Sequence, residues 1–287
     1  MAISGKTKVY GVIGDPIEHS LSPIMHNAAF KALKLDCTFV AFKVTPAEVG
    51  NAVCGMCALD IQGLSVTMPH KKAVISYLDE VDKTARFLSA VNTIHNRNGT
   101  LFGFNTDGVG ALQALVENGV KVEGKKVLLL GAGGAARAIA YELAQKTDQL
   151  VILNRTPKPA IELASFLKKA FKVEVTGDPL SPITIKNEIA EADVLINATS
   201  VGMKPEDDLT PVPWQLLKRK LAVMDIVYNP IETQLLKDAK AWGAKVVSGV
   251  EMLIYQGAAS FEIWTGREAP VEVMRKAAFK HLRMVLS

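Results

Sequence analysis

The sequence KKVLLLGAGGAAR, residues 125–137, joins a short apolar run to a glycine-rich turn. Residues 127–130 are wholly apolar, which is typical of a strand buried on both faces of a parallel sheet. The turn fits G-x-G-x-x-A, and the Ala- and Leu-rich residues 135–144 favour a helix. A strand that turns into a helix on glycines leaves backbone N–H groups at the positive end of the helix dipole, where a pyrophosphate binds. The predicted phosphate contacts are Gly131, Ala132, Gly133, Gly134 and Ala135.

The strand predicted next, residues 150–153, leads into a polar and basic tip. An NAD site places Asp or Glu near this point to bind the ribose 2′-hydroxyl. This chain has Asn154, Arg155, Thr156 and Lys158 instead, which suit a 2′-phosphate, and the Arg155 guanidinium can stack on adenine. The alternative is a structural glycine turn followed by a solvated basic loop. Because strand, turn, helix and basic tip occur in register, the sequence predicts NADP(H) as cofactor.

Composition and charge indicate a globular protein with a sizeable core. Of the 287 residues, 49% are hydrophobic and 22% are charged. The 33 Lys and Arg against 29 Asp and Glu give a net charge of +4, and the basic residues are scattered, which argues against nucleic-acid binding. No apolar run reaches membrane-spanning length, and the N-terminus lacks a signal-peptide core. We therefore expect a cytoplasmic protein that does not bind membranes.

Neither the cysteines nor the histidines predict a metal site. Three cysteines imply no disulfide framework, and the C-x-x-C of Cys54 and Cys57 lies late in a predicted helix without a second pair. We expect structural thiols there, buried or half-buried. The five histidines lack ligand spacing, so no metal is expected.

The first half of the chain alternates strands and helices, which predicts a parallel sheet covered by helices. The expected strands are residues 9–13, 37–44 and 61–68, and the expected helices are residues 23–33, 46–59 and 70–78. Ser22 is a suitable N-cap, with Pro23 at the first helical position. Asn98-Gly99 between two short apolar runs predicts a hairpin.

The whole pattern predicts an α/β protein of two domains: an N-terminal α/β substrate domain and a Rossmann-type dinucleotide-binding domain. The N-terminal sheet has only three helices of its own, so we assign the helices expected at residues 250–264 and 270–286 back to it. The substrate domain then comprises residues 1–106 plus 243–287, and the NADP-binding domain comprises residues 107–242.

Polar residues gather at the strand ends of the first half. They include Ser20, Ser22, Ser65, Thr67, Lys71 and Asn92, followed by Asn105, Thr106 and Asp107 at the domain boundary. Hydroxyls, amides, one lysine and one carboxylate are suited to holding a small polyhydroxy acid.

The chain resembles the shikimate/quinate dehydrogenase family along nearly its whole length. The matching segments are Ser20-Leu21-Ser22-Pro23, Gly63-x-x-Val66-Thr67-x-Pro69-x-Lys71, Ala90-Val91-Asn92-Thr93, Gly103-x-Asn105-Thr106-Asp107-Gly108, the glycine turn, Asn154-Arg155-Thr156, Asn197-Ala-Thr-Ser-x-Gly-Met203, Asp225-x-x-Tyr228-x-Pro230 and Gly249-x-x-Met252-Leu253-x-x-Gln256. The resemblance implies reversible, NADPH-dependent reduction of 3-dehydroshikimate to shikimate, a step of chorismate and aromatic amino-acid biosynthesis.

The resemblance also implies roles for individual residues. Lys71 is the expected proton donor to the developing alkoxide, with Asp107 beside it orienting the lysine. The expected substrate contacts are Ser20, Ser22 and Tyr228 for the carboxylate, and Ser65, Thr67, Asn92 and Gln256 around the ring. Thr199, Met203 and Gly249 are expected at the cofactor. The alternatives are that Ser22 and Asp107 are helix caps and that Lys71 is a surface lysine.

Ser65 departs from the family pattern, which usually has Asn at this position. The shorter hydroxyl loses one hydrogen-bonding arm, so quinate dehydrogenase activity of broader substrate or cofactor range is an alternative function. A dinucleotide-sensing protein without turnover is a further alternative, which the presence of Lys71 and Asp107 disfavours. The oligomeric state is open, with a homodimer as one alternative.

Overall fold

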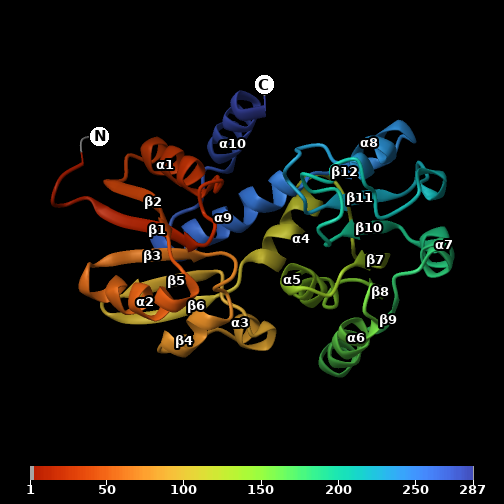
Figure 1. Ribbon diagram of the computed structural model, residues 1–287, viewed down its shortest axis with the longest axis horizontal. Coiled ribbons are helices and arrows are strands. Elements are labelled where there is room, and N and C mark those ends of the chain that lie inside the picture. The colour runs from red at the N-terminus through yellow and green to blue at the C-terminus, as the bar shows by residue number, and fades with distance from the viewer. Residues whose placement is uncertain (1–2, 287) are drawn as a thin grey trace. The chain divides into compact units, whose positions relative to one another are not determined.

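The computed structural model describes residues 3–286, which form two compact units (Figure 1). Unit 1 comprises Met1–Thr106 and Ile254–Ser287, and unit 2 comprises Asp107–Leu253. The first division falls between residues 106 and 107, within the polar Asn105-Thr106-Asp107 segment where the sequence predicts a domain boundary. The chain returns to unit 1 at residue 254 rather than at the expected residue 243, because β12 (Lys245–Val247) pairs with β11 of the second sheet. That pairing holds the chain in unit 2 as far as Leu253.

Unit 1 is built on a six-stranded mixed sheet in the order β2-β1-β3-β5-β6-β4. Its strands are β1 (Lys8–Gly14), β2 (Cys37–Lys43), β3 (Ile61–Val66), β4 (Glu80–Val81), β5 (Thr93–Arg97) and β6 (Thr100–Phe104). β1 pairs in parallel with β2 and β3, as the alternation of strands and helices predicts. β5 and β6 form the antiparallel hairpin predicted from Asn98-Gly99, and β5 joins the sheet by pairing antiparallel to β3.

Helices cover this sheet, including two from the end of the chain. They are α1 (Ser22–Ala32), α2 (Val49–Ala58), α3 (Lys83–Leu88), α9 (Gly249–Thr265) and α10 (Val271–Leu286), with short 3₁₀ helices η1 (Pro46–Glu48) and η2 (Ala73–Tyr77). α10 packs against α1. A core of aliphatic side chains from β1, β3, β5 and α2 lies between the sheet and α2, with Val53, Met56 and Leu64 almost wholly buried.

Unit 2 is an all-parallel six-stranded sheet in the order β12-β11-β10-β7-β8-β9. The remaining strands are β7 (Lys126–Leu130), β8 (Gln149–Asn154), β9 (Glu174–Pro179), β10 (Val194–Asn197) and β11 (Ala222–Asp225). Counted within the unit, this is the 3-2-1-4-5-6 order of a dinucleotide-binding fold, read from the other edge. The direction of winding reverses between β7 and β10, and ligands of such sheets bind at the carboxyl ends of the strands at this point.

The helices of unit 2 connect these strands and enclose a core formed by the strands' apolar residues. They are α4 (Asp107–Glu117), α5 (Gly134–Leu143), α6 (Pro157–Phe171), α7 (Pro182–Glu191) and α8 (Gln234–Ala241), with the 3₁₀ helix η3 (Trp214–Leu216). The central strand β7 is fully buried over Val127, Leu128, Leu129 and Leu130. Burial on both faces explains why the sequence of this strand is continuously apolar rather than alternating.

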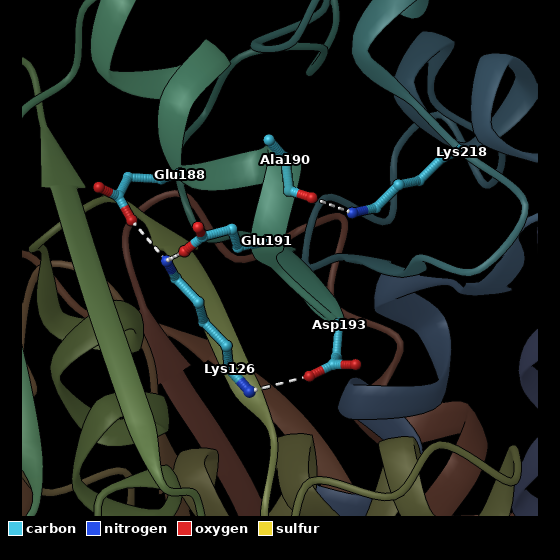
Figure 2. A network of polar contacts seen from close by, with 6 residues as sticks. All are labelled: Lys126, Glu188, Ala190, Glu191, Asp193 and Lys218. Atoms are coloured by element: carbon cyan, nitrogen blue, oxygen red, sulfur yellow. Dashed lines mark hydrogen bonds and ion pairs between the residues drawn. The ribbon is translucent and has the colours of Figure 1, made fainter.

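A charged network ties the start of β7 to the end of α7 (Figure 2). Lys126 Nζ lies 3.0 Å from Glu188 Oε2 and 2.9 Å from Glu191 Oε2, and its backbone N–H donates to Asp193 Oδ2 at 3.1 Å. Beside it, Lys218 Nζ donates to the Ala190 carbonyl at 2.6 Å. These contacts fix the amino end of the sheet, opposite the end where the glycine turn lies.

Expectations about the segment after β3 and about the cysteines of α2 are wrong. The helix expected over residues 70–78 is reduced to η2, because the His70 ring donates from Nε2 to the Val44 carbonyl at 2.6 Å and holds the preceding residues in a turn. The thiols of Cys54 and Cys57 are exposed rather than buried. The buried positions of α2 are Val49, Val53 and Met56, so helical geometry turns both cysteines away from this buried face.

His26 of α1 is wholly buried in an aromatic cluster of unit 1. Its ring stacks on Phe39 with centroids 4.5 Å apart and lies 5.3 Å from the Trp264 ring. Neither ring nitrogen has a hydrogen-bond partner within the part of the chain that the structure describes. Burial lowers the pKa of His26 to about 3, so the ring remains neutral in the folded protein. The buried polar atoms therefore make this position less stable than an apolar ring would.

We expect His26→Phe to stabilise the protein by about 1–2 kcal/mol at pH 7.5, because it removes two unsatisfied polar atoms. In the parent, the unfolded chain binds a proton at His26 below pH 6.5 while the folded chain does not, so stability falls as the pH falls towards 3. The gain should therefore grow by about 2 kcal/mol at pH 5. Urea unfolding of the parent and the variant at pH 7.5 and at pH 5 measures the difference in the free energy of unfolding. Phe30→Leu, in the same cluster, should keep the parental pH dependence; an unchanged slope in His26→Phe would contradict the assignment.

Candidate functional site

The glycine turn of unit 2 connects β7 to α5 and leaves its backbone donors at the helix start. Gly133 is the N-cap residue, with extended backbone and no side-chain capping bond, and the first intrahelical bond runs from the Arg137 N–H to the Gly133 carbonyl at 2.9 Å. The N–H groups at the start of a helix have no intrahelical acceptor. A Cβ built on Gly133 or Gly134 would meet no atom within 4 Å. The turn therefore fits a phosphate group approaching the backbone.

The loop after β10 lies directly against this turn. Gly131 has φ +109°, and a Cβ at this position would lie 2.6 Å from the Ala198 carbonyl oxygen and 3.4 Å from Thr199 Cγ2. Only glycine allows both this backbone conformation and this close approach. The Ala198 N–H donates to the Leu130 carbonyl at 2.8 Å, which continues the pairing of β7 and β10 one residue past the strands. Gly131 and Thr199 thus lie together at the reversal point of the sheet.

The basic tip after β8 is held by its own first residue. Asn154 Nδ2 donates to the Thr156 carbonyl at 2.8 Å, which closes the turn before α6. Arg155, Thr156 and Lys158 are exposed at this turn. Lys158 Nζ lies 3.9 Å from Glu162 Oε1, one turn further along α6, so this lysine forms an ion pair within the helix. Arg155 lies in the turn before the helix.

The remaining predicted residues of unit 2 also follow carboxyl ends of strands. Met203 lies in the loop after β10 and Tyr228 follows β11, each partly exposed. Gly249 follows β12, where a Cβ would lie 2.4 Å from the Ile226 carbonyl oxygen. Tyr228, which the resemblance assigns to the substrate carboxylate, therefore belongs to unit 2, whereas Ser20 and Ser22 belong to unit 1.

Several predicted site residues of unit 1 lie around the buried Asn92, which precedes β5. Asn92 Nδ2 donates to Thr106 Oγ1 at 2.9 Å and to Gln256 Oε1 at 3.4 Å, while its Oδ1 accepts from the Thr106 N–H at 2.9 Å. Thr93 Oγ1 also donates to Asn92 Oδ1 at 2.9 Å. This arrangement brings Asn92 and Gln256, predicted separately, into direct contact. It gathers amide and hydroxyl groups that can bind the hydroxyls of a small ring.

Sequence reasoning missed Ser260 on α9. Its hydroxyl is fully buried, 2.7 Å from Thr93 Oγ1 and 3.2 Å from Thr106 Oγ1. These contacts join residues that are more than 150 positions apart in the chain. Its spacing of one helical turn from Gln256 was the available signal, since residues at i and i+4 share a face of a helix.

Lys71 lies on the turn that His70 anchors, one residue beyond that buried ring. Its carbonyl accepts from the Val91 N–H at 2.8 Å, next to Asn92 in the chain. The side chain of Lys71 is half-buried rather than fully solvated. Asp107, also buried, is the first residue of α4 and directly follows Thr106, the partner of Asn92. The Lys71 backbone is thus bonded to Val91, the residue before Asn92, and Asp107 directly follows Thr106, a hydrogen-bond partner of Asn92.

The predicted substrate residues Ser20 and Ser22 follow β1, whereas Ser65 lies in β3 and Thr67 directly follows it. Ser20 Oγ accepts from the Ser22 N–H at 3.3 Å. The expectation that Ser22 is an N-cap is wrong, because α1 begins at Ser22 and Leu21 occupies the cap position. Ser65 is half-buried on β3, paired with Thr93 of β5, and the N–H of Thr67 donates to the Ile13 carbonyl at 3.0 Å.

Two further properties concern the described residues as a whole. Between residues 3 and 286, no group of three or more His, Cys, Asp or Glu side chains could hold a metal ion. Over the same residues, no helix is long and apolar enough to cross a membrane.

Comparison with known families matches three segments of the chain. Residues 12–94 match the shikimate dehydrogenase substrate binding domain, residues 113–231 match shikimate / quinate 5-dehydrogenase, and residues 249–279 match the shikimate 5'-dehydrogenase C-terminal domain. The chain is 49% identical to shikimate dehydrogenase (NADP(+)) of Thermococcus kodakarensis, over 96% of this chain and 97% of the relative. It belongs to the shikimate dehydrogenase family. The enzyme of the same name from Pyrococcus abyssi is 50% identical over 96% of this chain and 98% of its own length.

Solved structures of the shikimate dehydrogenase family share the fold. A shikimate dehydrogenase in complex with NADP+ superposes with a TM-score of 0.92 at 44% identity, covering 98% of each chain. The Listeria monocytogenes shikimate 5-dehydrogenase, in complex with shikimate and NAD, gives 0.91 at 38% identity, over 96% of this chain and 98% of its own. Quinate dehydrogenase from Corynebacterium glutamicum, in complex with NAD, gives 0.87 at 32% identity, over 96% and 99%. The predicted two-domain α/β fold is confirmed.

The two ends of the glycine turn should respond differently to an added methyl group. Gly131→Ala combines a positive φ with a clash against Ala198 and should destabilise the protein by about 2–4 kcal/mol. Gly133→Ala meets open space, so its cost should stay within about 1 kcal/mol, the loss of a favourable N-cap. Chemical unfolding without cofactor measures both. Equal destabilisation of the two variants would show that the close approach at Gly131 is not the constraint.

Proposed function

We propose that this chain catalyses the reversible, NADPH-dependent reduction of 3-dehydroshikimate to shikimate. The observation that carries the proposal is the cluster of amide and hydroxyl groups around Asn92, in a chain whose full-length relatives, 49–50% identical, are named shikimate dehydrogenase (NADP(+)). The chemistry of that cluster suits a small ring that carries several hydroxyls. The cytoplasmic location and the homodimer considered from the sequence stay predictions.

NADP(H) binding is assigned to the carboxyl ends of the strands of unit 2. The backbone N–H groups at the start of α5 would hold the pyrophosphate, and Arg155 with Lys158 would bind the 2′-phosphate. Asn154 supports this assignment, because its bond to the Thr156 carbonyl fixes the turn that carries Arg155. Thr199, Met203 and Gly249 would border the rest of the cofactor. When bound, NADPH supplies the hydride for the keto carbon of the substrate.

Substrate binding is assigned mainly to unit 1. Asn92, Thr67, Ser65 and Gln256 would bind the ring and its hydroxyls. Ser20 and Ser22 would hold the carboxylate, with Tyr228 of unit 2 as a further contact. Support comes from the hydrogen bond between Asn92 and Gln256, which pre-orients two of these side chains. A preorganised site loses little side-chain entropy when a ligand binds.

Lys71 is the proposed proton donor, and Asp107 is the proposed partner that orients it. As the keto carbon gains hydride, negative charge develops on the oxygen. The Lys71 ammonium stabilises this charge and transfers a proton from Nζ to the oxygen, which leaves the neutral amine to regain a proton from water. The anchored turn after His70 supports the assignment, because a proton donor must be held in place.

Because Ser stands at position 65, quinate is the second candidate substrate. Where the family pattern has Asn, this chain has the shorter hydroxyl, and a family member of this fold is a quinate dehydrogenase in complex with NAD. Steady-state assays with shikimate and quinate, each with NADP+ and NAD+, test the proposal. We expect the highest kcat/KM for shikimate with NADP+. Higher kcat/KM for quinate would favour the alternative, and cofactor binding without turnover of either acid would favour a sensing protein.

Lys71→Ala should lower kcat by about two orders of magnitude or more, with little change in the KM for shikimate, because a general acid acts in the transition state. The neighbouring, exposed Lys72→Ala is the matched control and should keep parental kinetics. A rise in KM alone for Lys71→Ala would assign this lysine to substrate binding instead.

Arg155→Ala should weaken NADP+ binding much more than NAD+ binding, since NAD+ lacks the 2′-phosphate. The lost charge-assisted contact is worth roughly 1.5–3 kcal/mol, which is about ten- to 150-fold in Kd. Lys158→Ala should have a smaller effect, because Glu162 already attracts that ammonium. Titration calorimetry with both dinucleotides measures the difference, and equal weakening of the two would place the tip away from the 2′-position.

A further inference from the structure

Asp225, the last residue of β11, is a fully buried carboxylate at the carboxyl end of the second sheet. Its Oδ1 accepts from Asn197 Nδ2 at 3.0 Å and from the Val227 N–H at 3.1 Å. Its Oδ2 accepts from Thr233 Oγ1 at 2.7 Å. All three of these donors are neutral groups. Burial outweighs them and raises the pKa of Asp225 to about 6. The ionised side chain is therefore held at a cost that its contacts do not remove, which suggests a role beyond stability.

The carboxylate determines which way the Asn197 side chain faces. Asn197 is the residue paired with Asp225 across β10 and β11, and it too is fully buried. An ionised carboxylate can only accept hydrogen bonds, so the Asn197 amide must turn its NH₂ group towards Asp225. Its carbonyl oxygen, Oδ1, must then point the other way.

That oxygen holds the start of the loop that follows β10. Asn197 Oδ1 accepts from the Thr199 N–H at 3.1 Å and from Thr199 Oγ1 at 2.7 Å. Asn197 Nδ2 also donates to the Val201 carbonyl at 3.2 Å, and the Val201 N–H donates to Thr199 Oγ1 at 3.2 Å. Reversal of the amide would place NH₂ against the Thr199 N–H and Oδ1 against the Val201 carbonyl, so Asn197 would lose its bonds to both backbone groups.

The loop held in this way forms one wall of the phosphate-binding turn. Its first residue is Ala198, whose carbonyl lies against Gly131. At the other end of the loop, Gly202 has φ +90° and lies beside Thr233, the second side chain bonded to Asp225. The carboxylate thus contacts, through Asn197 and Thr233, both ends of the segment from Ala198 to Gly202.

We propose that Asp225 is a positioning residue for cofactor binding, which sets the orientation of the Asn197 amide and thereby holds the Thr199 loop against the glycine turn. The inference rests on the proposed assignment of Thr199 and the glycine turn to NADP(H). Asp225 itself does not touch the cofactor.

Asp225→Asn keeps the shape of the side chain but adds donors, so it no longer forces one orientation of Asn197. We expect the Kd for NADPH, measured from nicotinamide fluorescence, to rise about fivefold or more, within the range for lost hydrogen bonds. The KM for shikimate at saturating NADP+ should change less than about twofold, because the substrate contacts lie mainly in unit 1. A Kd for NADPH within about twofold of the parent would overturn the proposal.

Two threonines provide matched substitutions, which also carry the test if Asp225→Asn does not fold. Thr233→Val removes one bond to Asp225 and should raise the Kd for NADPH about threefold, whereas Thr233→Ser keeps the hydroxyl and should restore parental binding. Thr147 is also a buried threonine, at the other end of the sheet, where its hydroxyl bonds to the Lys125 carbonyl. Thr147→Val should lower Tm without changing the Kd for NADPH. Equal weakening in both valine variants would mean general loosening and would overturn the proposal.

The direct binding measurement separates this inference from the proposed function. If the parent binds NADPH but oxidises neither shikimate nor quinate, the proposed activity fails, and the comparison of Kd values still tests Asp225. If the parent is active and Asp225→Asn binds NADPH normally, only the positioning role fails.

Discussion

The second unit depends on the close approach of the Ala198 carbonyl to Gly131. Parallel pairing of β7 with β10 places Leu130 opposite Asn197, so the two chains leave the sheet side by side and their next residues must share the same space. A side chain at position 131 would lie 2.6 Å from that carbonyl oxygen. The missing Cβ lets the two loops pack together, and the packed loops form the surface on which the backbone donors at the start of α5 face outward.

The two units hold their proposed binding groups by different physical means. A phosphate accepts hydrogen bonds from any N–H, so unit 2 can offer backbone groups whose direction the strand and helix dictate. A polyhydroxy ring requires donors and acceptors at defined places, which only side chains supply. Unit 1 therefore fixes Asn92 by contacts with Thr93, Thr106 and Gln256, and supports them with the buried Ser260. In unit 2 the buried Asn197 side chain instead hydrogen-bonds to the backbone of the loop that follows β10.

Features encoded by neighbouring residues could be predicted from the sequence, and features that depend on distant contacts could not. The β7 turn and the Asn98-Gly99 hairpin follow from local backbone chemistry, and both were predicted. The helix expected after Pro69 failed because His70 bonds to Val44, 26 residues earlier. Ser260 joins Thr93 across 167 residues, and Asp225 joins Asn197 across 28. Helical spacing can show that Gln256 and Ser260 share a face of α9, but it does not show which distant residues that face meets, so the network behind each site had to come from the structure.

The two ends of the second sheet hold buried and half-buried charged side chains in different ways. At the amino end, the largely buried Lys126 ammonium pairs with the half-buried Glu188 and the exposed Glu191, so each of these acids faces a cation (Figure 2). At the carboxyl end, a dianionic phosphate would be repelled by an exposed acid. Asp225 is instead enclosed on β11, separated from β7 by β10, and its oxygens are occupied by three donors. The acid can thus orient Asn197 while the positive end of the α5 dipole still dominates the field at the glycine turn.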